Sequence, residues 1–186
     1  MKILIITLFA ITFSFADTTY KNGRYCECDS IYREYYPSGE IITEIPYRNG
    51  VKNGLVKGYY YTGQLWYKSP YVNGKQNGVG FSYHESGTVK TETMYQHNNK
   101  VGMEKFYYDS GNIHYEISYN NYGEKHGIEK WYYESGAVRC ETTYHNDNTI
   151  IGKCYYESGE IRRIDDIDTV KWYYRSGEIM RIEYKK

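Results

Sequence analysis

The stretch Trp131-Tyr132-Tyr133-Glu134-Ser135-Gly136-Ala137-Val138 is one copy of a phrase that recurs along the chain. When the copies are aligned on their glycine, the spacings are 24, 24, 24, 25, 23 and 18 residues. A nearly fixed period in this range is typical of a repeat protein, in which each unit packs on the next. The aligned glycines are Gly39, Gly63, Gly87, Gly111, Gly136, Gly159 and Gly177.

Each copy has the pattern of a β-hairpin. Two aromatic residues come first, a serine or threonine precedes the glycine, and an alternating run follows. Glycine tolerates the positive φ that a reversing turn requires, so the Ser-Gly step predicts the hairpin turn. The tyrosine pairs are Tyr35-Tyr36, Tyr59-Tyr60, Tyr107-Tyr108, Tyr132-Tyr133, Tyr155-Tyr156 and Tyr173-Tyr174, with Tyr83-His84 as the one variant.

The second strand of each hairpin should have two different faces. In the fourth copy Ile113, Tyr115 and Ile117 fall on one face, and Glu116 points the other way. Asn-Gly turns, as at 48–50 and 72–74, then lead to the next tyrosine strand. Because no window shows a helical apolar stripe, we predict an all-β fold of tandem hairpins in an elongated, twisted antiparallel meander sheet.

The two ends of the chain differ from the repeats. Residues 1–16 combine Lys2, an apolar run and Ala16, which is the pattern of a cleaved signal peptide. We therefore expect export to the periplasm, the cell surface or the exterior. Residues 17–34 are expected to form an irregular N-terminal cap, and residues 35–184 the repeat array.

Composition narrows the classes of partner. The chain has 23 basic and 23 acidic residues without long blocks of either sign, so neither nucleic acid nor an acidic membrane lipid is an expected partner. Its 26 tyrosines outnumber its 5 phenylalanines. Since a tyrosine has an apolar ring and a polar tip, this composition favours thin, half-exposed layers over a thick aliphatic core.

The pattern Tyr-Tyr-x-x-Gly, followed by Tyr-x-Asn-Gly and a further glycine, resembles the bacterial variant of the MORN repeat over about Tyr20 to Tyr184. It is similar in particular to the YwqK-type family of toxin-antitoxin antitoxins. The resemblance implies tandem β-hairpins in a grooved sheet that binds partners, and the antitoxin family implies neutralisation of a toxin by contact. The copies from Ile161 onward depart from the pattern.

A second resemblance concerns Trp131-Tyr132-Tyr133 followed by Ser135-Gly136. It is similar to the aromatic repeats of cell-wall-binding modules, which hold choline or glycan between aromatic rings. Those repeats carry tryptophan in nearly every copy, whereas only Trp66, Trp131 and Trp172 occur here.

The cysteines form two separated pairs. Cys140 and Cys154 flank a turn that we place near Asp147, so they should face each other across a hairpin and form a disulfide. Cys26 and Cys28 lie about four repeats away. They could form a capping staple, a redox pair, a link to a partner or half of a metal site.

No catalytic constellation is evident in the sequence. There is no Gly-x-Ser-x-Gly elbow and no phosphate-binding loop, and the five histidines lie in different repeats without a His-x-x-x-His spacing. We therefore expect no enzyme activity, no cofactor and no metal.

The candidate partner-binding residues follow from strand alternation. One ring of each tyrosine pair should pack between repeats while its neighbour contacts a partner, and carboxylates on the charged face could recognise a basic partner. The candidates are Tyr60, Tyr108, Tyr133, Tyr156, Glu92, Glu116 and Glu141.

The leading hypothesis is an exported, non-enzymatic repeat protein that binds another macromolecule, most simply a protein, through an aromatic groove. The alternatives are an antitoxin or immunity protein and a module that binds cell-wall glycan. The exposed end strands also make a homodimer by edge pairing conceivable.

Overall fold

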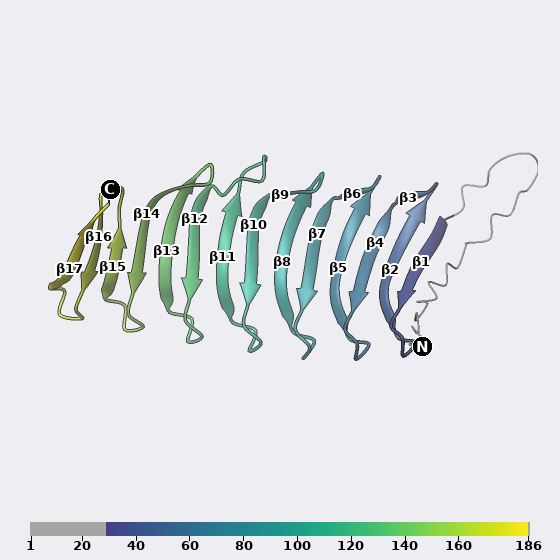
Figure 1. Ribbon diagram of the computed structural model, residues 1–186, viewed down its shortest axis with the longest axis horizontal. Coiled ribbons are helices and arrows are strands. Elements are labelled where there is room, and N and C mark those ends of the chain that lie inside the picture. The colour runs from purple at the N-terminus through teal and green to yellow at the C-terminus, as the bar shows by residue number, and fades with distance from the viewer. Residues whose placement is uncertain (1–28, 186) are drawn as a thin grey trace, which may run out of the picture.

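The computed structural model describes residues 29–185, which form one open antiparallel sheet of 17 strands. The strands follow one another in sequence order along a single extended layer (Figure 1). This is the predicted all-β meander. The predicted signal peptide and the Cys26, Cys28 pair lie outside the described residues, and the described part of the chain contains no helix able to cross a bilayer.

Seven hairpins make up most of the sheet. Their first strands are β1 (Asp29–Tyr35), β4 (Gly54–Tyr59), β7 (Gly78–Tyr83), β10 (Gly102–Tyr107), β12 (Gly127–Tyr132), β14 (Asn148–Tyr155) and β16 (Thr169–Tyr173). Their second strands are β2 (Ile41–Arg48), β5 (Leu65–Val72), β8 (Val89–Gln96), β11 (Ile113–Tyr119), β13 (Val138–His145), β15 (Ile161–Asp165) and β17 (Ile179–Tyr184). Three two-residue strands, β3 (Val51–Lys52), β6 (Lys75–Gln76) and β9 (Asn99–Lys100), pair beside the connecting turns.

The Ser-Gly turn closes each hairpin as predicted. In the fifth hairpin the amide of Tyr133 donates to the carbonyl of Ala137 at 2.8 Å, and the amide of Gly136 donates to the carbonyl of Tyr133 at 2.9 Å. Gly136 has a φ of 87°, which a residue with a side chain rarely adopts. The strand register shifts by one residue beside this turn, between Trp131 and Tyr132.

The opposite edge of the array carries tight two-residue turns. Asn49 and Gly50 both have positive φ, of 50° and 74°, the geometry of a type I′ hairpin turn. Asn146 and Asp147 adopt the same conformation between β13 and β14. The turn near Asp147 is therefore where the sequence placed it.

The irregular cap expected over residues 17–34 is wrong for its described part. β1 is a regular strand that pairs with β2 from Asp29 to Tyr35. The pair Tyr35-Tyr36 comes at the end of a first strand in this fold, so the residues just before it belong to that strand and not to a cap. The array therefore begins at least six residues earlier than predicted. It ends at Tyr184, as expected.

The sheet has two faces with different contents. The ladder face carries the residues four positions after each repeat glycine, such as Thr43 and Tyr115, and the charge face carries the next residues, such as Glu44 and Glu116. The buried aliphatic residues Val56, Ile117 and Val170 belong to the ladder face. No described side chain is completely buried, so tyrosine rings and long polar side chains shield a single layer.

Candidate functional site

In four of the six tyrosine pairs the first tyrosine links two repeats on the charge face. Its hydroxyl donates to the glutamate five residues after the preceding repeat glycine. The bonds are Tyr59 to Glu44 at 2.9 Å, Tyr107 to Glu92 at 3.3 Å, Tyr132 to Glu116 at 2.7 Å and Tyr155 to Glu141 at 3.0 Å. Burial, followed by the bond and charge of Glu116, raises the pKa of Tyr132 to about 12.

The second tyrosine also links repeats, in the other direction. Its hydroxyl donates to the backbone carbonyl of the first tyrosine position in the following repeat. These bonds are Tyr36 to Tyr59 at 3.1 Å, Tyr60 to Tyr83 at 2.7 Å, Tyr108 to Tyr132 at 2.8 Å, Tyr133 to Tyr155 at 2.9 Å and Tyr156 to Tyr173 at 2.9 Å. The interpretation that only one ring of each pair packs between repeats is therefore wrong: both rings hold the array together.

The glutamates do not form a row of carboxylates. Side chains on adjacent strands alternate in sign along the charge face, and Lys130 Nζ lies 3.3 Å from Glu141 Oε1. The paired positions run Glu92, Lys105, Glu116, Lys130, Glu141 and Lys153. Because Glu116 and Glu141 each stand between two lysines and Glu92 stands between Phe81 and Lys105, this stripe is electrically balanced, and the predicted acidic surface for a basic partner is not formed.

The disulfide between Cys140 and Cys154 is present as predicted. The two residues lie directly opposite each other on β13 and β14, with their Cα atoms 4.0 Å apart. They belong to the ladder face, next to Trp131 on β12. The disulfide therefore closes the hairpin around Asn146 and Asp147 and joins the fifth repeat to the sixth.

One line of residues runs across all the repeats on the ladder face, and we call it the ladder row. It consists of the positions five before and four after each repeat glycine, which pair with one another from strand to strand. Its members from β1 to β8 are Glu34, Thr43, Gly58, Tyr67, Ser82 and Thr91. Its members from β10 to β17 are Phe106, Tyr115, Trp131, Cys140, Cys154, Arg163, Trp172 and Arg181.

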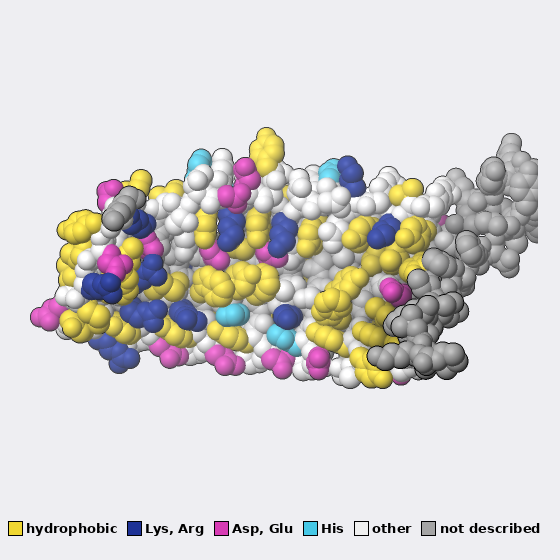
Figure 2. Space-filling view, in the orientation of Figure 1, with side chains coloured by type: hydrophobic (Ala, Val, Ile, Leu, Met, Phe, Trp, Pro, Cys, Tyr) yellow, Lys and Arg dark blue, Asp and Glu magenta, His cyan; other side chains and the backbone are white. Residues whose placement is uncertain are grey.

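From β10 onward the ladder row is filled. The rings of Phe106 and Tyr115 stack at 4.0 Å between centroids, and those of Tyr115 and Trp131 at 4.4 Å. Farther on, the guanidinium groups of Arg163 and Arg181 lie 5.8 and 5.1 Å from the ring of Trp172. The stacked rings cover one another, and Figure 2 shows the resulting hydrophobic band over β10–β13.

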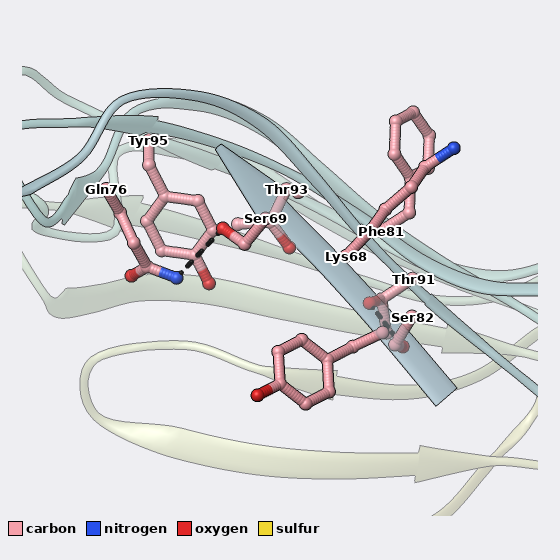
Figure 3. A pocket seen from close by; sticks show the side chains of 10 residues that line it. Lys68, Ser69, Gln76, Phe81, Ser82, Thr91, Thr93 and Tyr95 are labelled. Carbon is pink, nitrogen blue, oxygen red and sulfur yellow. Dashed lines mark hydrogen bonds between the residues drawn. The ribbon is translucent and has the colours of Figure 1, made fainter. Parts of the chain in front are cut away.

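From β4 to β8 the ladder row is hollow. Gly58 has no side chain, and the Tyr67 ring lies across it so closely that a Cβ on Gly58 would be 2.1 Å from a ring carbon. The ring of Tyr95 lies in the same way over Gly80, two residues before Ser82, where a Cβ would be 3.3 Å from a ring carbon. Tyr67, Gly80, Ser82 and Tyr95 border a groove with a volume of about 130 Å3, shown in Figure 3.

The groove is polar at its floor and aromatic at its sides. Gln76 Nε2 donates to Ser69 Oγ at 3.1 Å, and the hydroxyls of Ser82 and Thr91 are 2.6 Å apart. Its remaining lining residues are Tyr67, Lys68, Gly80, Phe81, Thr93 and Tyr95. In Figure 3 the amide of Gln76 and the hydroxyl of Ser69 meet beside Tyr95, the hydroxyls of Ser82 and Thr91 meet at the other end of the groove, and Lys68 and Phe81 point away.

Buried carboxylates support the ladder face beside this groove. Glu104 is only 4% exposed and accepts hydrogen bonds from Thr93 at 2.8 Å, Lys100 at 2.7 Å and Tyr119 at 3.0 Å. Burial and this carboxylate raise the pKa of the Tyr119 hydroxyl. Lys100 is therefore neutralised locally, and the groove has no free charge from this cluster.

The equivalent site one repeat later uses Glu129. This carboxylate is 7% exposed, accepts a hydrogen bond from Trp131 Nε1 at 3.1 Å and lies 3.8 Å from Lys125 Nζ. Burial, followed by the charges of Glu104 and Glu129, raises the pKa of Tyr115 to about 12. Trp131 thus contacts both Tyr115 and Glu129 on the ladder face, and its stack on Tyr115 joins β11 to β12.

Two histidines come together that the sequence left in separate repeats. The rings of His126 and His145 lie 4.9 Å apart, and His126 Nδ1 is 3.2 Å from the side-chain oxygen of Asn146. Within residues 29–185 no group of three histidine, cysteine or acidic residues is arranged to hold a metal ion.

Sequence reasoning missed the groove residues Tyr67, Gly80 and Ser82, and Gly58, which lies under the Tyr67 ring. The signal that could have found them is the alignment itself, since Gly58 and Ser82 occupy the position of Phe106 and Trp131. A small residue at a position that other repeats fill with a ring marks a hollow in the sheet.

The sequence profile of the MORN repeat variant matches residues 29–49, 52–73, 76–97, 100–121 and 125–146, together more than half of the chain. The chain belongs to the MORN repeat variant family. No curated protein matches the sequence. The last two hairpins of this MORN-variant protein, which contain β14 to β17, lie beyond the matched repeats.

Proposed function

We propose that this protein is a non-enzymatic binding protein that holds another protein on its ladder face, with the β5–β8 groove as the anchoring site. The observation that carries the proposal is the contrast within the ladder row. Seven hairpins share one backbone plan, yet the small residues Gly80 and Ser82 leave a groove beside the ladder row, where later repeats carry stacked rings.

The chemistry of the groove suits a side chain of a protein partner. Its volume of about 130 Å3 is on the scale of one side chain, and large anchors in such pockets dominate many protein interfaces. The rims are the rings of Tyr67 and Tyr95, and the floor offers hydroxyls and the Gln76 amide. An uncharged or weakly polar anchor matches this lining better than an anion or a cation.

The neighbouring surface would hold the rest of the partner. Trp66 is 48% exposed and lies 5.2 Å from Tyr67, between centroids. Exposed aromatic residues supply large contact area at low cost in side-chain entropy. The stacked rings of the filled half have their flat faces against one another, which favours a protein partner over a glycan that needs an open ring face.

The test is capture of envelope proteins from the source cells by immobilised protein. The variant Ser82→Phe fills the groove, and Ser110→Phe places the same bulk on an exposed turn outside it. We expect Ser82→Phe to lose a captured protein that the wild type and Ser110→Phe both retain, with all three showing the same circular dichroism spectrum. Equal capture by Ser82→Phe would contradict the proposal, as would retention by purified wall glycan in place of a protein.

A further inference from the structure

Among residues 29–185, each of the two end strands of the sheet is paired on one side only. β1 pairs with β2 and β17 pairs with β16, and no other strand of the described chain pairs with either. Every residue of β17 is exposed, including Ile182 at 38% and Tyr184 at 78%. β1 exposes Ile31 at 53%. Both ends therefore present apolar side chains beside unpaired backbone groups.

The repeats follow one rule where they meet. The residue four after a repeat glycine pairs with the residue five before the next glycine, as Tyr115 pairs with Trp131, and Glu116 then pairs with Lys130. β17 runs in the direction of the second strands and β1 in the direction of the first strands. A β1 strand placed beside β17 would therefore continue the antiparallel order.

Applying this rule to a second copy gives a specific register. Arg181 falls opposite Glu34 of the second copy, and Ile182 falls opposite its Arg33. Two positions farther, Tyr184 meets Ile31. The register thus pairs the opposite charges of Arg181 and Glu34 in the ladder row. It also pairs Tyr184 with Ile31 on the charge face, and both kinds of cross-strand pair stabilise sheets.

The hydroxyl of Tyr174 would also find a hydrogen-bond acceptor in a second copy placed in this register. Tyr174 is the second tyrosine of the last pair, and the second tyrosines of the inner pairs donate to the carbonyl of the first tyrosine in the next repeat. The Tyr174 side chain is 50% exposed, and its hydroxyl has no hydrogen-bond partner within residues 29–185. The equivalent acceptor in a second copy is the carbonyl of Tyr35.

We propose that copies of this protein associate head to tail, with β17 of one copy paired to β1 of the next. Charges on edge strands often block pairing, but Arg181 and Glu34 have opposite signs at the positions that meet, so they select this pairing. A head-to-tail contact uses two different surfaces, so each added copy leaves a new end open. The product is a chain of copies that grows with concentration.

Sedimentation velocity over a concentration series tests the proposal. We expect the weight-average mass of the full-length purified protein to rise continuously with concentration, beyond that of a dimer. Glu34→Arg and Arg181→Glu should each weaken association by about tenfold, because a favourable pair becomes a repulsive one. The double variant restores the pair with its signs exchanged and should associate like the wild type.

Two controls make the result specific. Glu85→Arg changes an exposed charge in an inner repeat and should leave association unchanged, and circular dichroism should show all variants folded. A wild type that stays monomeric at every concentration would overturn the proposal. A dimer weakened by Arg181→Glu but not by Glu34→Arg would overturn it in favour of symmetric β17 pairing.

Discussion

The two halves of the ladder row show how one backbone plan can give two different surfaces. Between β4 and β8 the row contains Gly58, Ser82 and Thr91, and a groove opens beside Tyr67. Between β10 and β14 the same positions hold stacked rings and a disulfide. The proposed function therefore places binding in the repeats with the groove and leaves the repeats with stacked rings to supply stability.

The largest expected effect is in the filled half. Trp131→Ala removes a ring that stacks on Tyr115 and donates to Glu129, so it should lower the free energy of unfolding by about 3 kcal/mol. Ser82→Ala, at the same repeat position in the hollow half, should change it by less than about 1 kcal/mol. Urea unfolding followed by far-ultraviolet circular dichroism measures both. Equal losses would remove the distinction between the halves.

Loss of the disulfide should have the next largest effect. Replacing Cys140 and Cys154 by serine frees the β13–β14 hairpin and should cost about 2 kcal/mol, since a loop of this length is constrained in the unfolded chain. Hydrogen exchange should speed up over β13–β15 and stay unchanged over β4–β8. Thiol labelling and peptide mass analysis that find Cys140 and Cys154 free in the native protein would show that the bond is not used.

A pair of glycine substitutions sharpens the comparison from the other side. Gly58→Ala brings a Cβ against the Tyr67 ring and should destabilise the protein by about 1.5 kcal/mol while pushing that ring out of place. Gly152→Ala meets its nearest neighbour at 3.6 Å and should be tolerated. Thermal unfolding of the two variants checks this. A harmless Gly58→Ala would mean that the Tyr67 ring is not held across the glycine.

Single hydroxyls between repeats should matter less. Tyr108→Phe keeps the ring but removes the hydrogen bond to the Tyr132 carbonyl, and should cost about 1 kcal/mol. Tyr60→Phe should cost a similar amount, because both halves use the same bond to hold repeats together. Denaturant midpoints of the two variants test this equivalence, and a loss in only one of them would show that the halves also differ in their inter-repeat bonds.

The smallest expected effect is a pH dependence confined to the filled half. Burial, followed by the charge of Arg139, lowers the pKa of His114, whose ring packs 5.2 Å from Trp131. The unfolded chain therefore takes up this proton more readily, and stability should fall slightly as the pH drops from about 7 to about 5. The fall should vanish in His114→Asn. A variant with the wild-type pH profile would assign the effect to another group.

The sequence was enough to predict the hairpins and the disulfide because both depend on counting residues along one strand pair. Cys140 and Cys154 flank a turn whose centre could be placed at Asp147, so their meeting follows from the register. The meander follows from the repeat period and from the absence of helical patterning. Both features depend on residues that lie within one repeat of each other in the sequence.

The candidate site could not be predicted in the same way because it depends on neighbours from other repeats. Alternation along one strand predicts that Glu116 faces outward, but it does not show that Lys105 and Lys130 stand on either side. The register shift beside each Ser-Gly turn also sends the Tyr108 hydroxyl to the next repeat rather than to solvent. The role of Gly58 and Gly80 could not be predicted because it depends on the rings of Tyr67 and Tyr95, which come from a neighbouring strand and lie over these glycines.

The affinity of a captured partner for groove-filled protein tests the central claim most directly. Isothermal titration should show that Ser82→Phe weakens binding by at least about tenfold, the loss of one anchor side chain from its pocket. The control Ser110→Phe, in the fourth repeat, should bind like the wild type. Unchanged affinity of Ser82→Phe, with binding lost instead on disruption of the Tyr115 and Trp131 stack in a folded variant, would contradict the account.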